Sequence, residues 1–158
     1  MKKYISISYD YFPSADGLNS EQLETLKAAE KAHQKAHAPY SNFKVGAALL
    51  LNDGKMIYGS NQENKAFPSG LCAERVALFS YGAHENGQGI AKLAIMAVDS
   101  SGLNGNGLLS PCGGCRQAMV EYSNLQDTPF EIIMQNSDGS VVVFQNIKDL
   151  MPMSFGIE

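Results

Sequence analysis

The sequence predicts one α/β domain in which a mixed sheet of about five strands lies between helices. Apolar runs of strand length alternate with segments of helical period through most of the chain, and no repeat or linker divides it. The length of 158 residues also suits one hydrophobic core. With 44% hydrophobic and 18% charged residues, the composition is that of a soluble globular protein. We therefore expect residues 1–158 to fold as a single domain.

The N-terminal part is expected to contain a short strand and a helix. Residues 4–11 alternate apolar with polar side chains, which is typical of a half-buried strand. A helix should begin after Asn19, because Gln22 stands where a capping box needs it and Leu and Ala residues follow at helical spacing. Ala38 precedes Pro39 and should end this helix, since proline disfavours helical backbone in the residue before it.

A hairpin and a second helix should follow. The nearly continuous apolar run 43–51 indicates a buried strand, and the turn signal at 52–54 leads back into a second strand at 55–59. After a loop, Cys72 begins a helix with an apolar face, which we expect to end near Gly87.

The remaining elements continue the alternation of strands and helices. Residues 92–98 indicate another buried strand, and the Ser-, Asn- and Gly-rich stretch 99–110 indicates a loop. A helix is predicted over 111–122. Its first residue is a proline, which suits that position because the amide hydrogen there has no partner within the helix. The apolar segments 130–135 and 141–144 flank a turn signal and predict a second hairpin or a tight connection between strands.

Three cysteines, Cys72, Cys112 and Cys115, point to a metal site. They are an odd number and too few for a secreted disulfide scaffold. Cys112 and Cys115 are three residues apart at a helix start, where they face one side and where the helix dipole favours the thiolate form. With Cys72 at another predicted helix start, three ligands leave one tetrahedral position of zinc open for water, which is typical of a catalytic site.

Two neighbours of Cys72 complete this hypothesis. Glu74 can move protons at the metal site if its side chain and that of Cys72 point to the same place. This requires Cys72 to lie at or before the start of the helix, because side chains two residues apart within a helix face nearly opposite sides. Arg75 and the two helix N-termini can balance the excess negative charge of three thiolates. The spacing of Cys112 and Cys115 also serves redox dithiols and structural zinc sites. A redox dithiol does not require Cys72 beside Glu74, and a structural site of three cysteines and one histidine would need a histidine at a ligand-like spacing, where none stands.

Charge and hydropathy exclude several classes of partner. Twelve basic against sixteen acidic residues give a net charge of -4, with no basic run, so a polynucleotide substrate is disfavoured. No stretch approaches the roughly 20 apolar residues of a membrane span. Ser6, Ser8 and Asp10 interrupt any signal-peptide core, and we expect a cytoplasmic protein.

The segments around the three cysteines closely resemble the zinc-dependent cytidine deaminases. Three further blocks resemble the family's other motifs in family order, and the resemblance covers roughly residues 23 to 158. The matching segments are 40–48, 61–64, 72–75, 111–117 and 152–156. The resemblance implies a three-layer cytidine-deaminase-like fold. Residues 1–18 form an N-terminal extension, and neither they nor the Gly-rich stretch 102–107 has a counterpart in the family pattern.

The resemblance also implies the reaction. One zinc per chain, held by Cys72, Cys112 and Cys115, activates water for attack on C4 of cytosine, and Glu74 relays protons to N3 and to the leaving amine. Cytidine and deoxycytidine then give uridine and deoxyuridine plus ammonia, a step of pyrimidine salvage. Arg75 would be a charge-balancing neighbour of the ligands.

Substrate contacts follow from the same resemblance. Asn61 and Glu63 would hydrogen-bond the ribose 3′-hydroxyl, Phe43 would pack against the nucleoside, and the backbone of Ala73 would orient the base. Because Glu63 would repel a phosphate, a free nucleoside suits this pocket better than a nucleotide.

The resemblance further implies a homotetramer in which Phe155 completes a neighbour's pocket. The C-terminal tail agrees with this, because it alternates apolar with small residues and would be costly to leave in water at a chain end. A tail folded back on its own subunit is the other possibility.

Two alternative functions stay open at this point. A related branch deaminates cytosine nucleoside antibiotics such as blasticidin with the same zinc motifs. The fold could also serve as a non-catalytic, zinc-stabilised binding module, although such a module gains nothing from Glu74.

Overall fold

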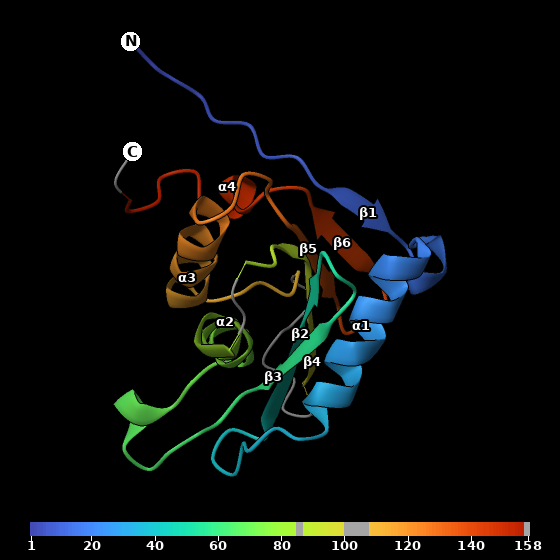
Figure 1. Cartoon of the computed structure of the whole chain (residues 1–158), viewed down its shortest axis with the longest axis vertical. Coiled ribbons are helices and arrows are strands. Elements are labelled where there is room, and N and C mark those ends of the chain that lie inside the picture. The colour runs from blue at the N-terminus through green and yellow to red at the C-terminus, as the bar shows by residue number, and fades with distance from the viewer. Residues whose placement is uncertain (85–86, 100–107, 157–158) are drawn as a thin grey trace.

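The computed structural model describes residues 1–84, 87–99 and 108–156, which form three layers with a mixed sheet in the middle (Figure 1). The sheet has six strands in the order β1-β6-β5-β4-β2-β3; β4 and β5 are parallel and every other neighbouring pair is antiparallel. The strands are β1 (Asp10–Phe12), β2 (Phe43–Leu51), β3 (Met56–Ser60), β4 (Ile90–Asp99), β5 (Glu131–Gln135) and β6 (Val141–Phe144). The helices are α1 (Ser20–His33), α2 (Ala73–His84), α3 (Gly113–Asn124) and α4 (Ile147–Leu150), with 3-10 turns at Ala15–Gly17 and Phe67–Ser69.

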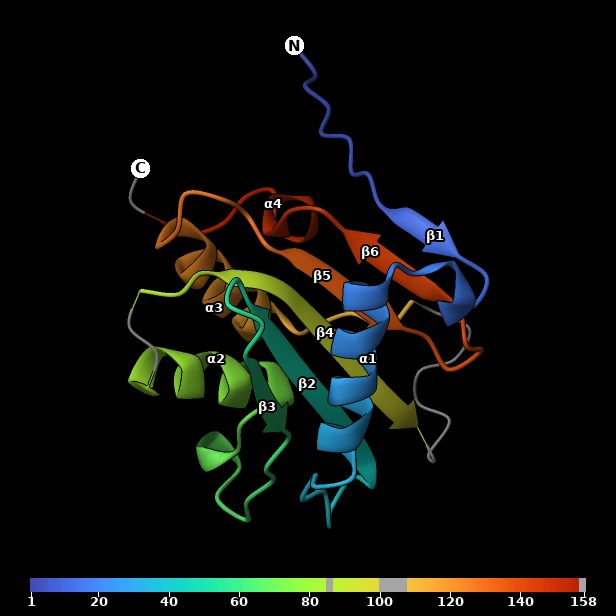
Figure 2. The ribbon, with the colours of Figure 1, turned by 45° about the vertical axis from the view of Figure 1, so that its right-hand side comes forward.

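Helices cover both faces of the sheet, as predicted. Helix α1 lies on one face, and α2 and α3 lie on the other (Figure 2). Two separate apolar clusters fill the spaces between these layers, because buried strand residues alternate between the faces. Val141 and Val143 of β6 pack with α1, whereas Val142 packs on the side of α2 and α3.

Two glycines let the helices approach the sheet closely. A Cβ at Gly46 of β2 would overlap the backbone of α1 at Ala29 and His33. A Cβ at Gly59 of β3 would overlap the carbonyl oxygen of Ala73, the first residue of α2. Glycine at position 59 therefore sets how deeply the start of α2, and with it the preceding cysteine, sits against the sheet.

Most central elements match their predictions, whereas the limits of two helices and the N-terminal strand differ. The strand 43–51, both hairpins and the layered mixed sheet are confirmed, although the sheet has six strands rather than about five. Helix α1 carries the predicted capping box at Asn19. It ends at His33, before the predicted limit, because His37 exchanges backbone hydrogen bonds with the segment after β3.

The predicted strand over 4–11 is wrong for most of its length. Strand β1 contains three residues and pairs with β6 only as far as Val143. Strand β6 ends at Phe144, whose ring lies 5.3 Å from that of Tyr9, so residues before Tyr9 have no strand to pair with. Ile5 and Ile7 are more than half exposed. This segment extends away from the domain (Figures 1 and 2).

The start of one helix needs correction, one short helix is additional, and one predicted loop lies mostly outside the described residues. Helix α3 begins at Gly113 with Cys112 as its N-cap, so Pro111 precedes the helix instead of opening it. The short helix α4 was not predicted. The Gly-rich stretch 102–107, most of the predicted loop around it and residues 85–86 lie outside the described residues. Within the described residues, no helix has the length and apolar character that crossing a bilayer requires.

Candidate active site

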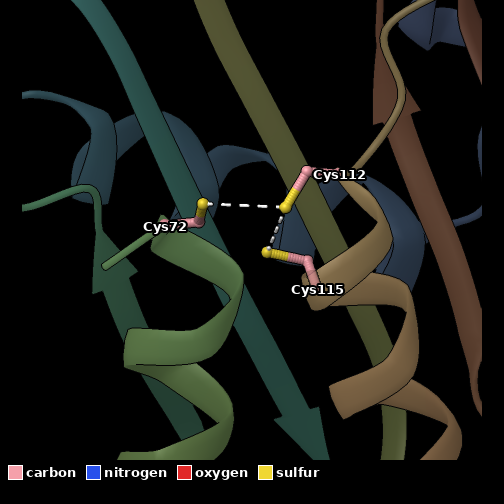
Figure 3. Close-up of side chains that lie close together, drawn as sticks. All are labelled: Cys72, Cys112 and Cys115. Atoms are coloured by element: carbon pink, nitrogen blue, oxygen red, sulfur yellow. Dashed lines mark hydrogen bonds between the residues drawn. The ribbon is translucent and has the colours of Figure 1, made fainter. Parts of the chain in front are cut away.

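The three cysteines come together at the facing starts of α2 and α3 (Figure 3). Cys72 immediately precedes α2, Cys112 caps α3 and Cys115 lies in the first turn of α3. The Sγ atoms of Cys72 and Cys112 are 3.9 Å apart, those of Cys112 and Cys115 are 3.5 Å apart, and all three lie within 4.8 Å of one another. Thiolates sharing one tetrahedral zinc lie about 3.8 Å apart, because each Zn–S bond is about 2.3 Å long. The donor set therefore fits zinc in both type and spacing.

Charge around the cluster favours a thiolate at Cys72. The pKa of Cys72 is lowered to about 5 because its sulfur accepts a hydrogen bond from Cys115 and is close to Arg75, whose Nη2 lies 3.7 Å from it. The same shared proton raises the pKa of Cys115. Arg75 thus lies where it can balance negative charge on the sulfurs.

Glu74 lies beside the cysteines and is almost fully buried, with 5% of its surface exposed. Its position follows from the helix start, because Cys72 lies outside α2 and both side chains can then turn toward one site. Burial raises the pKa of Glu74 to about 7, and the nearby charge of Cys72 adds to this effect. A carboxyl group with this pKa can both accept and donate a proton near neutral pH.

A pocket of about 670 Å³ opens above this cluster. Its walls come from the cysteine cluster, the loop before β2 and the segment that follows β3. They include the predicted residues Phe43, Asn61, Glu63, Cys72, Glu74, Arg75 and Cys112, together with Tyr40, Ser41, Val45, Gln62, Asn64, Phe67, Gly70, Leu71 and Ser110. Ala73 is fully buried and Phe155 is 85% exposed; neither lines this pocket.

Asn61 has a structural role that the sequence did not reveal. Its Nδ2 donates to the carbonyl oxygen of Phe43, and its Oδ1 accepts from the backbone nitrogen of Val45, both at 2.8 Å. These bonds continue the pairing of β2 beyond the end of β3. One Nδ2 hydrogen remains for a ligand.

Asn61→Ala is expected to destabilise the protein. The substitution leaves an amide and a carbonyl of β2 without partners, and each such group costs about 1–3 kcal/mol when it is buried. Urea unfolding of the zinc-loaded protein measures this loss. Gln62→Ala is the matched control, because the exposed Gln62 side chain bonds only Ser60 within the part of the chain that the structure describes. An unchanged unfolding free energy in Asn61→Ala would contradict the structural role.

Arg116 holds the segment that carries the cysteines, and sequence analysis gave it no role. Its guanidinium donates to the carbonyl oxygens of Pro111 at 2.9 Å and Leu150 at 2.8 Å, and to the hydroxyl of Ser110 at 2.5 Å. These contacts join the start of α3 to the end of α4.

The next residue, Gln117, holds the C-terminal tail on α3. Its side-chain amide accepts a hydrogen bond from the backbone nitrogen of Phe155 and donates one to the carbonyl oxygen of Phe155.

Comparison with known proteins identifies the family. Residues 19–130 match the family model described as the cytidine and deoxycytidylate deaminase zinc-binding region. The chain belongs to this family. The model of the cytidine and deoxycytidylate deaminase family covers most of the residues of this chain. Its description as a zinc-binding region agrees with the cysteine cluster. Zinc is the cofactor that the family and the cluster indicate.

Individual members of the deaminase family are similar over nearly the whole chain. A probable cytidine deaminase of Dictyostelium discoideum is 36% identical over 142 residues, covering 89% of this chain and 88% of the relative. A cytidine deaminase of Halalkalibacterium halodurans is 35% identical and covers 84% and 92%. The crystal structure of cytidine deaminase from Burkholderia pseudomallei has 40% identity and a TM-score of 0.72, covering 87% of this chain and all of the other. These similarities confirm the predicted family and its fold.

Proposed function

We propose that this protein is a zinc-dependent hydrolase that converts cytidine and deoxycytidine to uridine and deoxyuridine, releasing ammonia. The observation that carries the proposal is the cluster of Cys72, Cys112 and Cys115 beside the buried Glu74, at a pocket whose wall includes Cys72, Cys112 and Glu74. The similarity to cytidine deaminases over most of the chain supports the same reaction. Such an activity serves pyrimidine salvage.

Each residue of the cluster has a defined part in this proposal. Cys72, Cys112 and Cys115 would hold the zinc, which would supply the Lewis acidity that makes a water molecule a nucleophile at neutral pH. Glu74 takes a proton from the attacking water and delivers it to N3 of the base. It then takes the proton of the new C4 hydroxyl and delivers it to the departing amine. A C4–O bond forms and the C4–N4 bond breaks, so that water and cytidine balance uridine and ammonia. Arg75 offsets the negative charge of the sulfurs.

The pocket suits a nucleoside without phosphate. Among its described lining residues, Arg75 is the sole cation, and its guanidinium is already directed to Cys72. Glu63 adds a negative charge on the side of the pocket proposed for the sugar. Phe43 supplies an apolar surface for the nucleoside, and the backbone of Ala73 orients the base. A phosphate in this pocket would meet repulsion without a compensating cation.

Ultraviolet spectroscopy of the purified, zinc-loaded protein tests the function. Loss of absorbance is followed for cytidine, deoxycytidine, CMP and blasticidin at equal concentration. We expect turnover of both nucleosides and little of CMP. Turnover of blasticidin alone would indicate the antibiotic branch. Bound zinc without turnover of any substrate would indicate a binding module and overturn the proposal.

We also propose a homotetramer with twofold symmetry in which Phe155 of one subunit completes the pocket of another. The Phe155 side chain is 85% exposed and does not line the pocket of its own chain, and Gln117 holds its backbone on α3. An aromatic ring supplied by a neighbour can pack on the flat cytosine ring. We propose a cytoplasmic location, which agrees with three free thiols used for metal binding.

Mixing two inactive variants should restore activity if the sites are shared. A Phe155→Ala chain combined with a Glu74→Gln chain gives some pockets with both residues intact, so activity should exceed that of either variant alone. Met153→Ala is the matched control on the same exposed tail and should behave like the unmodified chain. Verified mixed oligomers without recovered activity, or full activity of a monomer in light scattering, would remove the shared-site proposal.

A further inference from the structure

The loop that joins α1 to β2 folds against the segment after β3. His37 donates its backbone N–H to the carbonyl oxygen of Asn61, and Glu63 donates its backbone N–H to the carbonyl oxygen of His37. Asn42 adopts a left-handed backbone conformation, with φ 57°, and turns the chain into β2 at Phe43. The side chains of this loop and of Glu63 consequently share one wall of the pocket.

The hydroxyl group of Ser41 connects two of the proposed substrate contacts. It donates a hydrogen bond to Oε1 of Glu63, and it accepts one from the backbone nitrogen of Phe43 at 3.0 Å. A serine hydroxyl has one donor hydrogen, so its rotation is fixed by the bond to Glu63. Ser41 therefore ties the carboxylate to the residue that begins β2.

The other oxygen of Glu63 is held by the same loop. Its Oε2 accepts from the backbone nitrogen of Tyr40 at 2.9 Å and from that of Ser41 at 3.3 Å. These donors lower the pKa of Glu63, with the Ser41 hydroxyl as the largest cause, so the group is ionised at neutral pH.

The bonds to Glu63 leave few acceptor positions on its carboxylate for a ligand. An ionised carboxylate offers about four lone-pair positions, two on each oxygen. The two backbone amides occupy both positions on Oε2, and the Ser41 hydroxyl occupies one on Oε1. With the donors of the described residues counted, one acceptor position is left, on Oε1 beside Ser41. It accepts one hydroxyl donor and offers nothing to a ligand oxygen that carries no hydrogen.

We propose that Ser41 is a positioning residue for sugar recognition: it orients Glu63 so that the free lone pair of Oε1 receives the 3′-hydroxyl of the nucleoside. The inference rests on the proposed function, in which Glu63 contacts that hydroxyl. Without the Ser41 hydroxyl, the donors to Glu63 would all be on Oε2, so the carboxylate could rotate, and the Phe43 amide would lose its partner.

A double-mutant cycle on Ser41 and Glu63 tests this proposal with a matched pair of substrates. Deoxycytidine and 2′,3′-dideoxycytidine differ only in the 3′-hydroxyl group. Ser41→Ala should raise KM for deoxycytidine about 10-fold, as expected for one hydrogen bond to a charged group, and change kcat less than about twofold. The dideoxy analogue should show no such increase. Ser41→Thr keeps the hydroxyl and should restore KM to within about threefold.

The cycle separates the role of Ser41 from the role of Glu63. If Ser41 acts through Glu63, Ser41→Ala should add almost nothing in a Glu63→Ala background. Additive effects, or a Ser41→Ala enzyme with unchanged KM while Glu63→Ala is impaired, would overturn the inference and leave the sugar contact of Glu63 standing. An unaffected Glu63→Ala enzyme would overturn both. An unmodified protein that turns over no nucleoside would overturn the proposed function itself.

Melting temperature and zinc content of each variant show whether it folds. If Ser41→Ala is unstable, Ser41→Cys provides the second test, because a thiol has a similar size but is a weak hydrogen-bond donor. It should raise KM for deoxycytidine in the same direction as Ser41→Ala. A folded Ser41→Cys enzyme with the KM of the unmodified protein would contradict the positioning role.

Discussion

Replacing Glu74 with glutamine is expected to lower kcat by about 10²- to 10⁴-fold, because an amide of the same size cannot transfer the protons that the reaction requires. Zinc content should stay at one per chain, since Glu74 is not among the three sulfur donors of the cluster. The folded state should be at least as stable as before. Burial disfavours the charged form of Glu74, and a neutral amide removes that penalty.

Metal analysis, calorimetry and steady-state kinetics on one preparation check this result. Glu121→Gln is the matched control, because Glu121 is an exposed carboxylate on α3 and the substitution makes the same change from carboxyl group to amide. The control should keep kcat, zinc content and melting temperature. A Glu74→Gln enzyme with near-native turnover and one zinc would show that another group transfers the protons.

Cys72→Ala should weaken zinc binding by more than about 100-fold and abolish activity. Mutating partners outside the ligand set already costs 10- to 100-fold in affinity, and this substitution removes a ligand itself. Cys72 also supplies the contact between the start of α2 and the two cysteines of α3. The increase in melting temperature on adding zinc should shrink accordingly.

Cys72→His is the informative comparison, because it retains a zinc ligand at the same position with a nitrogen donor and one negative charge fewer. We expect this variant to keep more zinc than Cys72→Ala. Titration against a chelator of known affinity gives both binding constants. Full zinc occupancy of Cys72→Ala at the affinity of the unmodified protein would exclude Cys72 from the ligand set.

The residues of the metal cluster could be predicted because their chemistry is local. Cys112 and Cys115 are three residues apart at a helix start, and Cys72 and Glu74 flank the first residue of another helix. The strand 43–51 could also be predicted, because a nearly continuous apolar run of that length fits a strand buried on both faces.

Other features depend on contacts that no local pattern records. The alternation of residues 4–11 predicts a strand, but it cannot show that β6 ends too early to pair with it. The roles of Ser41 and Asn61 arise from bonds between the loop before β2, the start of β2 and the segment after β3. Arg116 acts on Leu150, 34 positions away in sequence. Each role becomes visible only when the chain has folded.

The position of the cysteines also links zinc binding to folding. Cys72 and Cys112 are 40 positions apart, so the fold is needed to bring their sulfurs close enough to share an ion. An ion that binds the folded chain and not the unfolded one adds its binding free energy to the stability of the fold, which can be a large share of the stability of a typical domain. The cellular abundance of this protein should therefore follow zinc supply, because chains without the ion unfold more often and are degraded sooner.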